Sequence, residues 1–144
     1  LRYHGPRNDL PEGDAPTEVI ALLPERQADI FCVRGNCEAE VDQMVLPFPV
    51  LADYCLLESA GHLIYATHGH HFNEDHLPPL HPGDVLLHGH THIPRRTLRD
   101  GVYVLNPGSV SIPKAGSWHG YMTLEDGVFT WKTLSGDVRE TLRL

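Results

Sequence analysis

Histidine is unusually frequent in this chain and gathers in two short segments. There are 11 histidines among 144 residues. Six of them form the two clusters, namely His68, His70, His71, His88, His90 and His92. Neutral imidazole is the commonest transition-metal ligand in proteins. The clusters therefore indicate a metal site.

Three segments share one design, in which an apolar run leads directly into glycine and ligand-type side chains. They are residues 32–38 (CVRGNCE), 64–70 (IYATHGH) and 86–92 (LLHGHTH). A rigid sheet can fix ligands at its strand ends, and an adjacent glycine lets the backbone turn sharply towards a metal. His90 and His92 are two positions apart, so they share one side of an extended chain, whereas a tight turn would bring them to two neighbouring ions.

Length, charge and cysteine content narrow the class of protein. A chain of 144 residues with 41% hydrophobic residues suits one globular domain, which we predict over residues 1–144. No apolar run approaches the ~20 residues that span a bilayer, so we expect no membrane partner. The net charge of −8 disfavours binding to nucleic acid. Three cysteines without a C-x-x-C pair are typical of free thiols in a reducing cytoplasm.

The elements that must position the ligand-type residues are mostly strands. Residues 1–13 read as an irregular loop, and a helix is expected from Ala15 and Pro16, capped by Asp14 and weakened beyond Pro24. Residues 30–33 suit a buried strand, and residues 46–50 an extended stretch. Glycine-containing turns at 58–61, 99–101 and 125–127 predict hairpins. The remaining strands are expected at 54–57, 62–66, 85–87, 96–98, 102–105, 121–124, 128–131 and 138–142.

The three segments also carry a family resemblance. Residues 35–38 (GNCE), 67–70 (THGH) and 89–92 (GHTH) resemble the third, fourth and fifth motifs of calcineurin-like metallophosphoesterases, in the family's order. Phrases at 4–8, 11–13, 41–44 and 106–114 are similar to its YfcE-type branch of bacterial phosphodiesterases. The resemblance implies a four-layer α/β/β/α sandwich, an α/β fold of the metallo-dependent phosphatase type. It also implies that the N-terminal strand and helix precede this chain.

The same resemblance implies a ligand set for two divalent transition-metal ions. Asn36, His68 and His90 would hold one ion and His92 the other. The family's D-x-H and G-D motifs supply the other ligands and are expected before Leu1, so we do not expect catalysis from this chain alone. Manganese is the ion that the resemblance favours, while imidazole, amide and carboxylate ligands also permit Zn, Fe, Co or Ni.

The implied activity is hydrolysis of a small-molecule phosphodiester by a metal-bridging hydroxide. Many family members have a histidine where this chain has Cys37. A thiol is a poor substitute for imidazolium, which favours diesters or good leaving groups. Cys37 is interpreted as a thiol that lines the site, and His70 as a residue that contacts substrate or supports His68.

Several alternatives stay open at this point. A non-catalytic scaffold, as in the retromer subunit that shares the fold, or an inactive fragment is the alternative if the D-x-H and G-D motifs are absent; a phosphomonoesterase or nuclease is less favoured. His88 is interpreted as structural, Cys32 and Cys55 as core, and residues 106–109 as either a turn or a site-facing loop. Three aromatic residues are expected in the sheet core or between copies of a homo-oligomer, namely Trp118, Tyr121 and Trp131.

Overall fold

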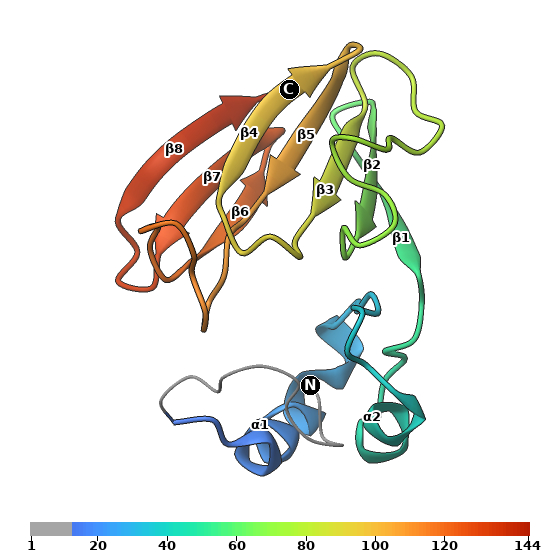
Figure 1. Cartoon of the computed structure of the whole chain (residues 1–144), viewed down its shortest axis with the longest axis vertical. Helices are drawn as coiled ribbons and strands as arrows, with labels where there is room; N and C mark the ends of the chain where they lie inside the picture. Colours follow the sequence, from blue (N-terminus) through green and yellow to red (C-terminus); the bar gives the residue numbers. More distant parts are fainter. Residues whose placement is uncertain (1–12) are drawn as a thin grey trace. The chain divides into compact units, whose positions relative to one another are not determined.

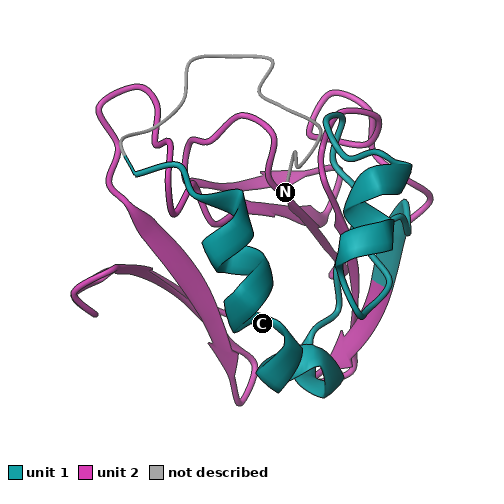
Figure 2. Cartoon of the chain, turned by 90° about the horizontal axis from the view of Figure 1, so that it is seen from below, with its two compact units in different colours: residues 1–55 teal, residues 56–144 magenta. Residues whose placement is uncertain are grey.

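A computed structural model describes residues 13–144 as two compact units, and Figure 2 shows them in separate colours. Residues 13–55 are the described part of unit 1, and residues 56–144 form unit 2. The loop expected over residues 1–13 lies, apart from Gly13, outside the described residues, as do the phrase at 4–8 and most of that at 11–13. A single domain over residues 1–144 stays a prediction.

Unit 1 is helical. It contains α1 (Pro16–Leu22), the 3₁₀-helix η1 (Pro24–Asp29) and α2 (Glu40–Val45). The predicted helix start is confirmed, but Asp14 does not cap it. Proline is favoured at the first helical position, so the residue before Pro16 becomes the N-cap, and that residue is Ala15. The helix α2 was not predicted; it begins where the carboxylate of the buried Asp42 accepts a hydrogen bond from Ala39 N, 2.9 Å away.

The strand expected at residues 30–33 is absent from the described structure. Phe31 is 83% exposed, and neither sheet of the described residues includes this segment. A strand needs a hydrogen-bonded neighbour, which an apolar run cannot supply by itself. Residues 46–50 instead place alternate side chains inside, so that Leu46, Phe48 and Val50 form the core of unit 1.

Unit 2 contains most of β1 and all of β2 to β8, in two sheets (Figure 1). The larger sheet has the order β1-β2-β3-β5-β4, in which β2, β3 and β5 run parallel and β4 is antiparallel to β5. The smaller sheet, β6-β7-β8, is antiparallel. The strands are β1 Tyr54–Ser59, β2 His62–Thr67, β3 Val85–His88, β4 Arg95–Arg99, β5 Val102–Asn106, β6 Gly120–Glu125, β7 Val128–Thr133 and β8 Val138–Arg143.

The predicted strands of this unit are confirmed, and three of the turns that join them are encoded locally. The three predicted hairpins each have two consecutive residues with positive φ, at Ala60-Gly61, Asp100-Gly101 and Asp126-Gly127. Two positive φ angles are the requirement of the hairpin turn whose twist matches that of the flanking strands, and glycine at the second position meets it without steric cost.

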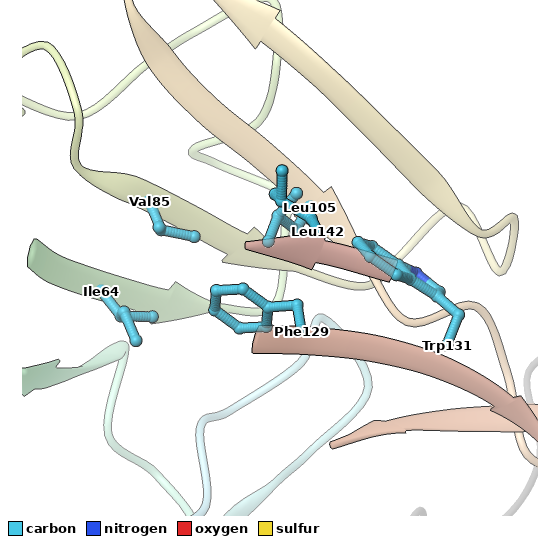
Figure 3. Packing of buried hydrophobic residues seen from close by; sticks show 6 residues of the cluster. All are labelled: Ile64, Val85, Leu105, Phe129, Trp131 and Leu142. Atoms are coloured by element: carbon cyan, nitrogen blue, oxygen red, sulfur yellow. The ribbon is translucent and has the colours of Figure 1, made fainter. Parts of the chain in front are cut away.

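The two sheets enclose the main hydrophobic core of unit 2. Ile64, Val85 and Leu105 of the larger sheet face Phe129, Trp131 and Leu142 of the smaller one, as Figure 3 shows. These are the two inner β-layers of the predicted sandwich. Trp131 is 1% exposed, as expected for a core aromatic residue, whereas Tyr121 is 37% exposed. Cys32 and Cys55 were predicted to be core, and both are half-buried. Cys32 packs against the core of unit 1, whereas Cys55 lies on the edge strand β1.

Within residues 13–144, no helix combines the length and the apolar character that crossing a bilayer requires.

Candidate metal centre

The predicted ligands of unit 2 follow strands whose carboxyl ends share one edge of the larger sheet. Thr67 pairs with His88, and Leu87 pairs with Leu105, in parallel register. The pairing continues past the strand ends, because Gly89 N donates a hydrogen bond to His68 O at 2.9 Å. His68 directly after β2 and His90 two residues after β3 are therefore brought side by side.

Three imidazole rings converge at this edge. The ring centroids of His68 and His90 are 4.9 Å apart, and those of His68 and His70 are 5.0 Å apart. The Nδ1 atoms of His68 and His70 lie 3.1 Å from each other, so one ring donates a hydrogen bond and the other accepts it. His70 thus contacts the ring of His68 directly.

His92 is held in the tautomer that a metal ligand needs. Its Nδ1 lies 2.8 Å from Ile112 O, and a carbonyl oxygen can only accept, so Nδ1 carries the proton. Nε2 is then the nitrogen with the lone pair. A backbone carbonyl that orients a histidine from its other nitrogen is a common second partner of metal ligands.

The backbone of the turn that carries both histidines is strained. His90 has φ 66° and His92 has φ 64°, in the left-handed region that non-glycine residues rarely adopt. Such a conformation persists only where surrounding contacts enforce it. The turn must therefore be held from outside.

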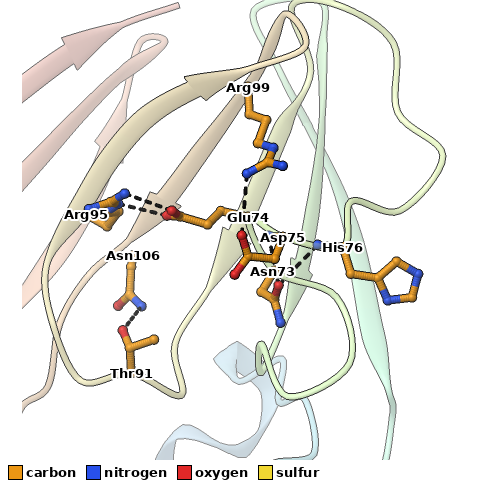
Figure 4. A network of polar contacts seen from close by, with 8 residues as sticks. All are labelled: Asn73, Glu74, Asp75, His76, Thr91, Arg95, Arg99 and Asn106. Carbon is orange, nitrogen blue, oxygen red and sulfur yellow. Dashed lines mark hydrogen bonds and ion pairs between the residues drawn. The ribbon is translucent and has the colours of Figure 1, made fainter.

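Asn106, at the end of β5, supplies that support. Its side chain is fully buried, and Nδ2 donates to Gly89 O at 2.7 Å. Nδ2 also donates to Thr91 Oγ1 at 3.1 Å, the contact that Figure 4 shows. Its Oδ1 accepts from Gly108 N at 2.8 Å. The sequence left residues 106–109 open between a turn and a site-facing loop; in the structure Asn106 is the last residue of β5 and its side chain contacts the 89–91 turn, and the site-facing role stays a prediction. The only signal for this role was the phrase at 106–114.

His88 is buried at the end of β3 and is 5% exposed. Its Nδ1 lies 3.1 Å from Gly89 O, and its Nε2 has no hydrogen-bond partner among the described residues. Burial lowers the pKa of His88, because the charged ring is poorly solvated there. Gly69 packs against this ring: a Cβ on Gly69 would lie 2.8 Å from His88 Nδ1.

Asn36 and Cys37 belong to unit 1, whereas the histidines belong to unit 2. Asn36 is exposed and Cys37 is a half-buried thiol, in a turn where Gly35 N donates to Glu38 Oε2 at 2.6 Å. In the part of the chain that the structure describes, no group of three or more His, Cys, Asp or Glu is arranged to hold a metal ion. The joint ligand set of Asn36, His68, His90 and His92 stays a prediction, as do the roles of Cys37 and His70.

The donor chemistry of unit 2 nevertheless fits a transition metal. Adjacent imidazoles suit Zn, Fe and Ni better than the hard, oxygen-preferring ions Mg and Ca. Ile112 O accepts a hydrogen bond from His92, and the side-chain amide of Asn106 donates one to the 89–91 turn. Hydrogen bonds of this kind orient the ligands of metal sites.

Comparison with known proteins identifies the family. Residues 11–126 match the calcineurin-like phosphoesterase superfamily domain. Phosphodiesterase YfcE of Escherichia coli K12 is 46% identical over 127 residues, which cover 88% of this chain and 69% of YfcE. The solved structure of YfcE, described as a phosphoesterase from E. coli, covers 96% of this chain and 77% of its own at TM-score 0.90 and 41% identity. A conserved Streptococcus pneumoniae protein shares the fold, at TM-score 0.52 and 20% identity over 90% of this chain and 91% of its own. The α/β fold expected from the motifs is thereby confirmed, and the chain belongs to the calcineurin-like phosphoesterase superfamily.

Proposed function

We propose that this protein is a metal-dependent phosphodiesterase with a dinuclear metal centre. The observation that carries the proposal is the convergence of His68 and His90 at the carboxyl edge of the sheet, beside a turn that orients His92 through Ile112 O. The similarity to phosphodiesterase YfcE supports hydrolysis of a phosphate diester.

Each proposed ligand has a separate task. Asn36, His68 and His90 would hold one ion, and His92 would hold the other through Nε2. When bound, two divalent ions activate a water-derived hydroxide at neutral pH and neutralise charge on the phosphoryl oxygens. The Ile112 carbonyl keeps His92 in its ligating tautomer. We assign the donor of the His68–His70 hydrogen bond to His68 Nδ1, which leaves His68 Nε2 available to a metal. Manganese is the ion we propose first.

We propose that Cys37 lines the substrate site and that His70 contacts the substrate or supports His68. A thiol protonates a leaving alcohol poorly, so a substrate with a good leaving group or a diester suits Cys37 better than an unactivated monoester. The net charge of −8 favours a small molecule over nucleic acid. A cytoplasmic location and a homo-oligomeric state remain predictions.

Replacing His90 tests the proposal. In the full-length protein, His90→Ala should lower bound transition metal, measured by elemental analysis, and abolish hydrolysis of bis(p-nitrophenyl) phosphate. The matched control is His81→Ala, because the side chain of His81 is 94% exposed and lies outside the histidine cluster. Metal-dependent turnover that survives in His90→Ala would refute the assignment.

The rival functions give different results in the same assay. A non-catalytic scaffold would show no metal-dependent turnover in the wild-type protein. A phosphomonoesterase would hydrolyse p-nitrophenyl phosphate faster than the diester.

A further inference from the structure

A cavity of about 330 Å³ lies beside His90 in unit 2. Its walls come from the segment after β2 and from the segment that joins β3 to β4. The residues that matter to its chemistry are Glu74, Asp75, His90, Thr91, Ile93 and Arg95. Ligand pockets range from about 300 to 1,000 Å³, so this one has room for a single small organic group.

We propose that this cavity holds the alcohol group that stays on phosphorus during hydrolysis, and that the Glu74–Arg95 ion pair selects an uncharged, hydroxylated group over an anionic one. The inference rests on the proposed function, because it places the scissile phosphate at His90. Hydrolysis adds hydroxide to phosphorus and breaks the bond to the leaving alcohol; the phosphate monoester produced retains the group in the cavity.

The position of the cavity favours a diester. His90 is both a proposed metal ligand and a wall of the cavity, so a phosphate held there has the cavity next to one of its substituents. Arg95 pairs in register with Asn106, which puts it at the same sheet edge as the histidines. A monoester has no second alcohol group to fill this space, whereas a diester has one.

The charges of the cavity decide which group fits. Arg95 donates from Nε and Nη2 to the two carboxylate oxygens of Glu74, at 2.8 Å each, a two-bond fork visible in Figure 4. Arg95 is the only cationic side chain among the described residues that line the cavity, and this fork occupies it. Asp75, paired with Arg99 at 3.4 Å, adds a second carboxylate to the rim.

The resulting surface suits hydroxyl donors. A carboxylate or phosphate on the retained group would meet two acidic side chains and no uncommitted cation in the described lining. A hydroxyl can donate to either carboxylate, and Ile93, which is 37% exposed, offers an apolar contact to the carbon chain.

The test uses two diesters with the same p-nitrophenyl leaving group and a different retained group, either 2,3-dihydroxypropyl or 2-carboxyethyl. The measured quantity is the ratio of kcat/KM for the carboxyethyl diester to that for the dihydroxypropyl diester, in the metal-loaded full-length protein. Glu74→Gln frees the guanidinium of Arg95 and should raise this ratio about fivefold, the effect of one partly exposed charge pair. Arg95→Gln should lower it.

The matched control is Arg96→Gln. Arg96 is the next residue of β4, and its substitution removes the same positive charge as Arg95→Gln. Arg96 pairs with Glu140 at 3.1 Å, however, and does not line the cavity. Its ratio should equal that of the wild-type protein.

A binding measurement supplies a readout independent of turnover. Calorimetric titration with 2,3-dihydroxypropyl phosphate and 2-carboxyethyl phosphate, the two products, should show the same shift of preference towards the carboxyethyl compound in Glu74→Gln. If all three variants turn over both diesters with the wild-type ratio of kcat/KM, this inference is overturned while the proposed phosphodiesterase function stands. Absence of turnover on every diester in the wild-type protein would overturn the proposed function itself.

Discussion

Replacing Asn106 with alanine would separate the support of the histidine turn from the histidines themselves. The substitution removes the hydrogen bonds to Gly89 O and Thr91 Oγ1 and the bond from Gly108 N. Because Asn106 is fully buried, Gly108 N loses a partner that water does not readily replace, whereas Gly89 O keeps the hydrogen bond from Thr91 N at 2.8 Å.

The magnitude follows from those contacts. A hydrogen bond contributes about 0.5–1.5 kcal/mol net, and a buried polar group left unsatisfied costs about 1–3 kcal/mol. One group of this kind, Gly108 N, together with the lost bonds to Gly89 O and Thr91 Oγ1 and the vacated side-chain volume, gives a loss of roughly 2–4 kcal/mol in the free energy of unfolding. The free energy of unfolding of a natural protein is about 5–15 kcal/mol, so we expect Asn106→Ala to remain folded but to be less stable.

The assay is urea unfolding followed by circular dichroism, together with a cobalt titration followed by visible absorption. Asn106→Ala should lower the unfolding midpoint and also weaken cobalt binding, because His90 and His92 no longer have an enforced backbone. Thr91→Val removes only one of the hydrogen-bond partners and should cost about 1 kcal/mol. Unfolding and cobalt affinity in Asn106→Ala that match the wild-type values would refute the supporting role of this residue.

Two further predictions concern the frame of the site. Leu63 N and His81 N donate to the carboxylate of Asp84, at 3.0 and 2.9 Å. Burial alone would raise the pKa of Asp84, but these bonds hold it below its ordinary value. The folded state therefore favours the carboxylate, and this stability is complete above the unfolded pKa of about 3.9 and is lost as pH falls through the lower folded value. Asp84→Asn should be less stable than the wild type in urea unfolding at pH 7, and the difference should shrink at pH 3; a difference independent of pH would contradict the assignment. Gly69→Ala would place a Cβ 2.8 Å from His88 Nδ1 at φ 110°, so we expect a loss of about 1–3 kcal/mol in the same unfolding measurement, and unchanged stability would show that the segment relaxes freely.

Local sequence was sufficient where a short-range physical requirement decides the structure. The Asp-Gly turns at 100–101 and 126–127 fix two positive φ angles, so the flanking strands were predictable close to their observed bounds. The histidine segments were also predictable at strand ends, because apolar runs stop abruptly at glycine and polar residues. The family followed from the ordered motifs.

Tertiary structure decided what depends on neighbours far along the chain. The apolar run at 30–33 has the composition of a strand but no pairing partner among the described residues, so Phe31 lies exposed. Asn106 supports the turn at 89–91 only because β3 and β5 are adjacent and parallel, which puts both strand ends at one edge. Composition and spacing specify which side chains can bind a metal; long-range strand pairing determines which of them meet and which buried groups hold them there.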